Sequence, residues 1–315
     1  MQARRLIALL TLAILAASAC TFTEQQTVAQ TLQDCDSCPA LVRIPPGEFQ
    51  VGLRDDEPLP PNVTPERLAA ERPAHTVRID YPFAIGISEV TVAEFNEFAK
   101  DTAFEAKGCF VLQGAGWVFD KTADWRKPGF AVTDQYPATC LSHDDFTAYL
   151  GWLSRKTGQT YRIPSEAEWE YMSRLGVGTD PVPATLGADA CRFLNGADQA
   201  FRRTLPADWP PGLLACDDGY PRASPSGSYP ANKLGMVDVF GNVAEWTADC
   251  AGTNHDGAPI DGSARIAEPC SSHVLKGGSW SGGPGYQRPA VRNSFPTNLR
   301  GDGHGLRVVR ELTTR

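Results

Sequence analysis

The stretch that decides the fold is LGMVDVFGNVAEW, residues 234–246. Two carboxylates, Asp238 and Glu245, bracket the turn-forming triplet Gly241-Asn242-Val243. Turning loops expose backbone carbonyls, and hard cations such as calcium bind several oxygens of this kind together with carboxylates. The alternative is that the two acidic residues only cap helices and stabilise turns. The stretch therefore predicts a loop built around charged groups, with or without a cation.

Three further stretches carry more information than composition: RIPSEAEWEY (162–171), KGGSW (276–280) and GLRV (305–308). In this order and spacing, and with the earlier IPPGEF (44–49) and EVT (89–91), they resemble the sulfatase-modifying-factor family, also called formylglycine-generating enzymes. The resemblance covers residues 39–312. It departs from the family at Ala244, where Trp is usual, and at Leu306, where Phe is usual.

The resemblance implies an α+β fold that is loop-rich and C-type-lectin-like. The composition agrees, because 29 Gly and 25 Pro make up about 17% of the 315 residues, above a background of roughly 12%. Capping boxes predict helices from Thr91 and Ser165, and a third helix is expected from Ser142 to a stop at Gly158. Short apolar runs predict strands at 41–44, 48–52, 75–79, 83–87, 274–276 and 306–309.

The resemblance also implies two structural calcium sites. The first would use the side chains of Asp238 and Glu245 with the carbonyls of Gly241 and Val243. The second would use the side chains of Asn195 and Asp218 with the carbonyls of Gly196 and Tyr220. The turn Asp217-Asp218-Gly219 supports the second set independently. Calcium here would hold together loops that a sparse core cannot.

The resemblance does not extend to the copper-binding cysteines of the family enzymes. Family enzymes oxidise a cysteine of a sulfatase to formylglycine with copper and O₂, and they place two cysteines just after the Gly-Gly-Ser stretch. Residues 277–288 read GGSWSGGPGYQR, and no cysteine follows Cys270. Since Cu(I) prefers thiolate ligands, copper is not expected here.

The equivalent groove could hold another chemistry or a ligand. Relatives without the cysteine pair include enzymes that mature peptide siderophores and proteins of unknown role. The groove candidates are Ser279, Trp280, Tyr286, Arg288 and Arg292. The alternatives are a core position for Trp280, a turn at Ser279, and surface charge or ion pairing with buried carboxylates for the two arginines.

The N-terminus predicts export. Arg4 and Arg5 precede the apolar run 6–17 and the small residues Ser18-Ala19, which is the layout of a signal peptide over residues 1–19. Cys20 follows at once and resembles the acylated cysteine of bacterial lipoproteins. Residues 20–38 are then expected to be a lipid anchor and polar tether, and 39–312 a single domain. We expect a periplasmic lipoprotein anchored in the outer membrane.

Nine cysteines divide into Cys20 and eight others. Disulfides persist in an exported protein, and chain order suggests the bridges Cys109–Cys140, Cys191–Cys216 and Cys250–Cys270. Cys35 and Cys38 are expected to form a local bridge. The five histidines are far apart in sequence and show no metal-binding spacing. The tripeptide Arg300-Gly301-Asp302 matches an integrin-type motif that arises often by chance.

Charge and hydropathy limit the function further. The chain carries 29 Lys and Arg against 37 Asp and Glu, which argues against nucleic-acid binding. No later apolar run is long enough to span a membrane, so membrane contact is expected through the lipid alone. The favoured hypothesis is a calcium-stabilised module that binds a peptide, a glycan or a periplasmic protein. The alternatives are sulfatase cysteine oxidation and a divergent oxidative modification such as siderophore peptide maturation.

Overall fold

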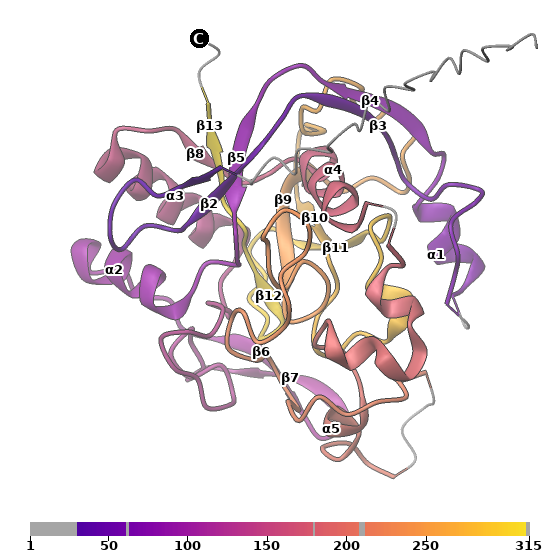
Figure 1. Ribbon diagram of the computed structural model, residues 1–315. Helices are drawn as coiled ribbons and strands as arrows, with labels where there is room; N and C mark the ends of the chain where they lie inside the picture. Colours follow the sequence, from indigo (N-terminus) through magenta and orange to yellow (C-terminus); the bar gives the residue numbers. More distant parts are fainter. Residues whose placement is uncertain (1–29, 61–62, 179, 208–211, 313–315) are drawn as a thin grey trace, which may run out of the picture.

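Two small sheets and two hairpins carry the architecture of the chain. The computed structural model describes residues 30–60, 63–178, 180–207 and 212–312 (Figure 1). The expected signal peptide 1–19 and Cys20 lie outside these residues. One sheet has the order β1 (Thr31–Leu32), β2 (Leu41–Ile44), β5 (Phe83–Gly86), β13 (Val309–Glu311), β8 (Tyr161–Arg162). The second has the order β11 (Asn293–Pro296), β10 (Ser272–Lys276), β9 (Ala244–Cys250), β12 (His304–Gly305).

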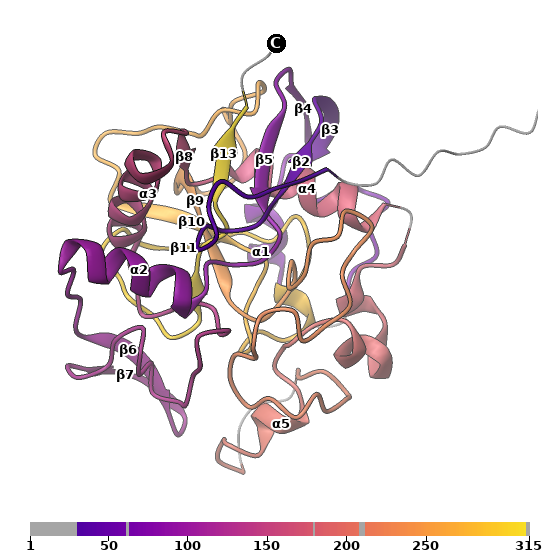
Figure 2. The same ribbon diagram turned by 60° about the vertical axis from the view of Figure 1, so that its left-hand side comes forward.

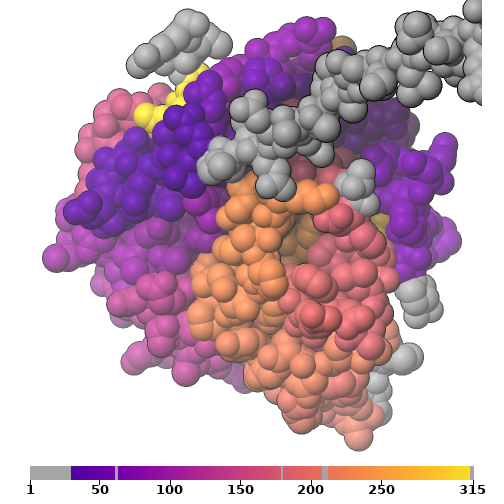
Figure 3. Space-filling view, in the orientation of Figure 1, coloured from indigo at the N-terminus to yellow at the C-terminus, as the bar shows by residue number. Residues whose placement is uncertain are grey.

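The hairpins pair β3 (Gly47–Val51) with β4 (His75–Ile79) and β6 (Cys109–Gln113) with β7 (Gly116–Asp120). In both ribbon views the β6–β7 hairpin and α5 (Gln199–Arg202) lie at the end of the molecule opposite the described C-terminal strand β13 (Figure 2). After α4 (Glu166–Val177) the chain is mostly loop, with the short 3-10 turns Pro183–Thr185, Gly187–Arg192 and Pro284–Tyr286. This loop-rich part covers the centre and lower right of the face seen in Figure 3.

The expected helices form where local capping chemistry places them. Thr91 and Glu94 form a reciprocal capping box at the start of α2 (Val92–Thr102), and Ser165 and Glu168 do the same for α4. The helix α3 (His143–Thr157) begins at Ser142, and Gly158 ends it in the left-handed conformation at φ 69°. Each cap satisfies backbone N–H groups that the first helical turn leaves free. A further short helix, α1 (Pro65–Ala70), lies in the loop between β3 and β4.

The core gathers aromatic side chains between α2 and α3. Phe95 is fully buried and packs edge-on against Phe98, Trp125 and Phe146, while its ring stacks with Tyr149. Edge-to-face pairs of this kind stabilise beyond their area burial. A second cluster surrounds Trp169 of α4 and carries the other half of the domain.

The four motif stretches meet around one buried ionic network. The Trp169 indole N–H donates to Glu245 at 2.6 Å, and Arg307 pairs with the same carboxylate at 2.8 Å. Lys276 pairs with Glu170 at 3.0 Å, and both side chains are fully buried. Removing one partner of a buried pair typically costs about 3–5 kcal/mol. The stretches therefore occur together because each supplies a charge that another must neutralise.

The expected strand 306–309 is wrong in its first part. The described strand β13 begins at Val309, while Arg307 leaves the ladder and donates to the carbonyls of Gly86, Ile87, Val237 and Asp238. A guanidinium that serves four carbonyls and a carboxylate needs an irregular backbone. Leu306, Arg307 and Val308 therefore form an irregular segment rather than a strand.

Part of the expected tether belongs to the folded unit. β1 pairs antiparallel with β2, and Asp34 accepts a hydrogen bond from the Tyr161 hydroxyl at 2.6 Å. Cys38 is 2% exposed. Residues from about Thr31 onward therefore pack on the domain, so the folded domain begins before residue 39.

All four expected disulfides form: Cys35–Cys38, Cys109–Cys140, Cys191–Cys216 and Cys250–Cys270. Within the described ranges, no helix is long and apolar enough to cross a membrane.

Candidate functional site

A groove of about 490 Å³ lies between the β6–β7 hairpin and the loop 278–286. Its walls carry several aromatic side chains, and none of the described residues that line it is Asp, Glu, Lys or Arg. The aromatic side chains on its walls are Phe110, Trp117, Phe201, Tyr286, Phe295 and His304. Trp117 is 48% exposed and Tyr286 43% exposed, so both offer free ring faces at the opening. Pockets of this size with apolar walls and few polar groups are typical ligand sites.

Two glycines that line this groove have no room for a side chain. A Cβ at Gly278 would approach the Tyr286 carbonyl oxygen to 2.6 Å, and one at Gly301 would approach His304 Nδ1 to 3.0 Å. Gly278 also has φ 75°, which favours glycine. The two glycines therefore let the loop 278–286 and the His304 ring pack closely at the groove wall.

The side-chain amide of Gln287 bonds across the loop that follows the Gly-Gly-Ser stretch. Gln287 is fully buried and its Nε2 donates to the carbonyls of Gly282 at 2.8 Å and Ser279 at 3.2 Å. The Ser279 and Ser281 hydroxyls lie 3.0 Å apart and line the groove. Neutral groups thus hold the segment in which the resemblance places a cysteine pair.

The described residues do not fit a copper site. All eight described cysteines are joined in disulfides, so none of them offers a thiolate. Within the described part of the chain, the only close group of three possible ligand residues is Cys250, Cys270 and His273, and its two sulfurs form one of those disulfides. His304 is the sole imidazole on the groove wall.

Only some of the expected groove residues line the groove in the structure. Ser279 and Tyr286 line the groove, and Trp280 is a fully buried core residue that reaches Asp302 with its indole N–H at 3.3 Å. Arg288 and Arg292 do not line it. Each forms a buried bidentate ion pair, with Glu71 and Glu166 respectively, which is the alternative that sequence reasoning left open.

Sequence reasoning missed two features near this groove. The first is a gathering of histidines around Trp246: the ring of His143 stacks on His273 at 3.6 Å, and His143 and His304 both meet Trp246 edge-on. Burial lowers the pKa of His304 to about 4, so it is neutral at pH 7. Only tertiary structure brings these residues together, and no spacing in the chain could have revealed them.

The second missed feature is Asp302, between the two groove glycines Gly301 and Gly303. It is 1% exposed; one carboxylate oxygen accepts the Leu112 N–H at 3.0 Å and the other has no partner among the described residues. Burial raises the pKa of Asp302 to about 7. The Arg-Gly-Asp tripeptide is therefore a buried structural segment, since Arg300 pairs with Asp145.

The first expected calcium set fits a cation in part. Asp238 keeps one buried oxygen without a described partner, and so does the neighbouring Glu89. Burial raises the pKa of Glu89, Asp238 and Glu245. The Glu245 carboxylate, however, is already bonded by Arg307 and Trp169. Gly241 and Val243 lie in the loop between them, so a cation here would be held by Asp238 and Glu89 more than by Glu245.

The residues of the second expected set have separate partners. The Asn195 amide donates to the Arg222 carbonyl, and its Oδ1 is buried without a described partner. Asp218 accepts the Tyr220 N–H at 2.7 Å and the Tyr229 hydroxyl at 2.8 Å. Burial raises the pKa of Asp218 to about 7. Gly196 instead packs against Gln287. A cation would replace the proton that this buried carboxyl otherwise keeps.

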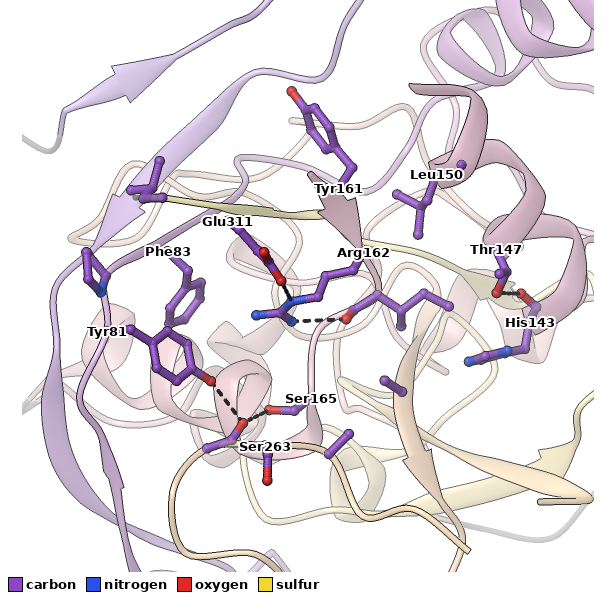
Figure 4. A pocket seen from close by; sticks show the side chains of 17 residues that line it. Tyr81, Phe83, His143, Thr147, Leu150, Tyr161, Arg162, Ser165, Ser263 and Glu311 are labelled. Atoms are coloured by element: carbon purple, nitrogen blue, oxygen red, sulfur yellow. Dashed lines mark hydrogen bonds and ion pairs between the residues drawn. The ribbon is translucent and has the colours of Figure 1, made fainter. Parts of the chain in front are cut away.

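A larger hollow of about 750 Å³ lies elsewhere, between α3, β8 and the loop 262–264 (Figure 4). Its polar groups bind one another: Tyr81 and Ser165 both donate to the Gly262 carbonyl, and Arg162 pairs with Glu311. His143 also lines the hollow, and its buried Nε2 has no partner among the described residues, so the hollow offers a ligand one unpaired polar group besides its apolar wall.

Comparison with known proteins fixes the family. The model of the sulfatase-modifying factor enzyme 1-like domain matches residues 25–312. The chain belongs to this family. Its fold is the family's loop-rich, C-type-lectin-like α+β fold, as the sequence predicted.

Relatives of this family member are similar over most of their length. The structure of PvdO from Pseudomonas aeruginosa superposes with a TM-score of 0.75 and 32% identity, over 90% of this chain and 98% of that one. The formylglycine-generating enzyme of Streptomyces coelicolor is 29% identical over 86% of this chain and 88% of its own. A mouse protein named inactive C-alpha-formylglycine-generating enzyme 2 is 28% identical over 67% of this chain and 68% of its own.

Proposed function

We propose that this protein is an exported lipoprotein, acylated at Cys20 on the periplasmic face of the outer membrane, whose domain binds an extended peptide in the groove. The observation that carries the proposal is the groove itself: aromatic side chains on its walls, and neither a charged residue nor a thiol among the described residues that line it. Aromatic side chains take apolar side chains of a peptide, and the Ser279 and Ser281 hydroxyls offer hydrogen bonds to its backbone. The family also contains a mouse relative named inactive, so loss of the family chemistry has a precedent.

We propose further that calcium stabilises the loops that shape this domain. Support comes from the buried oxygens of Asp238, Glu89 and Asn195, which have no partner among the described residues. Several oxygens in irregular loops are the environment that calcium prefers. Asp238 and Asn195, with the carboxyl of Asp218, would hold the ions without taking part in ligand binding.

The alternative is an enzyme of the same family. The disulfide-bonded cysteines disfavour oxidation of a sulfatase cysteine. One observation supports a divergent oxidative modification, such as maturation of a siderophore peptide. Asp302 lies beside the groove, and its pKa of about 7 suits an acid or base. For this candidate function, only the family relationship indicates the type of reaction.

One experiment separates these functions. The mature protein is incubated in air, with and without copper and a reductant, with a library of fluorescein-labelled pentapeptides that includes cysteine peptides. Fluorescence polarisation reports binding and mass spectrometry reports modification. We expect saturable binding with unchanged peptide mass. Conversion of a cysteine peptide to formylglycine, or any other mass change that requires the protein, would establish the enzyme instead.

A further inference from the structure

At the opening of the groove lies a cation, Arg67, that has no ion-pair partner among the described residues. Arg67 of α1 lies with its guanidinium carbon 3.8 Å above the Tyr286 ring, and its Nη1 donates to Asn293 Oδ1 at 3.2 Å. Tyr286 and Asn293 both line the groove. Arg67 therefore contacts the groove wall from outside and lies half-buried at its edge.

The neighbouring arginines are paired, and Arg67 is not. Arg72 pairs with Asp55, Arg288 with Glu71 and Arg292 with Glu166. Arg67 makes no ion pair with any described residue, and its side chain makes the single hydrogen bond to Asn293 among them. Arg222 does not line the groove: it lies 4.8 Å above the ring of the buried Trp280 and donates to backbone carbonyls, with Asp302 nearby.

The free donors of Arg67 have the geometry of a carboxylate receptor. A guanidinium has five N–H donors, and the bond from Nη1 to Asn293 leaves the Nε–Nη2 edge unused. That edge presents two parallel N–H groups, which match the two oxygens of a carboxylate. Stacking on Tyr286 and the bond to Asn293 fix the plane of the group, so less side-chain freedom is lost on binding.

We infer that the groove selects ligands that carry a carboxylate and that Arg67 binds this group. The inference rests on the proposed peptide-binding function and names the chemistry of its ligand. The carboxylate can be the C-terminus of the peptide or an acidic side chain, since both present the same two oxygens. The uncharged groove wall then takes the apolar part of the ligand beside it.

The test uses the library peptide that binds most tightly, made in three forms: a free acid, a C-terminal amide, and an amide with one added Glu. Each is titrated by fluorescence polarisation into wild type, R67Q, R67K and R72Q. The R72Q variant removes the same charge five residues away from an exposed pair, and thermal melting confirms that each variant folds.

We expect the free acid, or the Glu-containing amide, to bind wild type and R72Q about tenfold more tightly than the plain amide. In R67Q this difference should disappear, and R67K should restore part of it. Preference for the free acid identifies a C-terminal group, and preference for the Glu peptide identifies a side chain. Equal binding of all three forms to wild type would overturn the inference while leaving peptide binding intact. Failure of every library peptide to bind would overturn the proposed function, and the inference with it.

Discussion

At the scale of single residues, the domain is defined by ionisable groups buried in unusual states. Glu89, Asp238 and Glu245 surround the single guanidinium of Arg307, and burial raises the pKa of all three carboxyls. Asp302 shows the same effect beside the groove. Such groups store free energy that depends on pH, because a raised carboxyl pKa favours the protonated native state.

The pH dependence of stability should therefore isolate Asp302. Its pKa in the folded state is about 7, against roughly 3.9 in an unfolded chain. Between these values the native state binds more protons, so the contribution of this residue to stability falls as pH rises. Between pH 5 and pH 8, the free energy of unfolding of D302N should rise by about 3 kcal/mol relative to that of the wild type. Urea unfolding at both pH values measures this; a constant difference between the proteins would show that Asp302 ionises freely.

The motifs single out residues that make buried contacts in the structure, but they do not reveal the partners of those residues. The pattern marks Glu245 as important without revealing that Arg307, 62 positions later, bonds its carboxylate. Arg288 and Arg292 looked like groove residues because they follow the Gly-Gly-Ser stretch. The structure pairs them with Glu71 and Glu166, since a buried guanidinium needs a counter-charge. Partners of this kind come from distant segments and leave no local signal.

At the scale of elements, the β6–β7 hairpin shapes one wall of the groove. Cys109 at its start is bonded to Cys140, and the chain segment 300–302 runs between them. The Phe110 N–H donates to the Arg300 carbonyl, and the Cys140 N–H donates to the Gly301 carbonyl. The hairpin and the groove floor are thus joined through one disulfide and a short stretch of main chain.

Removing that disulfide should loosen the groove without unfolding the domain. A C109A/C140A variant releases a loop of 31 residues, and the stability loss is expected to be about 3–4 kcal/mol. Limited proteolysis should then cut first near the hairpin, and peptide affinity should fall. The matched control is C35A/C38A, which opens a loop of 3 residues at the other end of the sequence. Equal loss of peptide binding in both variants would contradict a local role for the hairpin.

Helices were easier to predict than this hairpin. Thr91, Ser142 and Ser165 begin helices because a capping side chain acts within one turn of its own sequence. The hairpin has no capping signal, and because Trp117, Val118 and Phe119 form a continuous apolar run, β7 lacks the alternation that marks a half-buried strand. Its exposed aromatic residues make sense only beside the groove.

At the scale of the whole molecule, four disulfides and a buried ionic network compensate for a chain rich in loops. The capping boxes, the disulfide pairing and the family fold followed from the sequence. The groove did not, because its walls come from β6, β7, α5, β11 and the loop 278–286. Assembly of such a site depends on packing between segments that are far apart in the chain.

Calcium should act on the whole molecule rather than on the groove. An ion present at about one hundred times its Kd adds roughly 2.7 kcal/mol to stability, so EDTA should lower Tm by about 5–10 °C. D238N and N195A should each reduce this effect, and D189N should not, because Asp189 is an exposed residue paired with Arg192. Calorimetry with added CaCl₂ checks the result; a Tm that ignores EDTA would remove calcium from the proposal.

The most direct test of the central claim compares two exposed aromatic residues. Trp117 is 48% exposed on the groove wall, and Phe193 is 39% exposed away from it. Fluorescence polarisation with the best pentapeptide should show at least a tenfold loss of affinity for W117A and no change for F193A, with both variants folded by circular dichroism. Unchanged binding by W117A, or equal loss in both variants, would contradict the groove as the binding site.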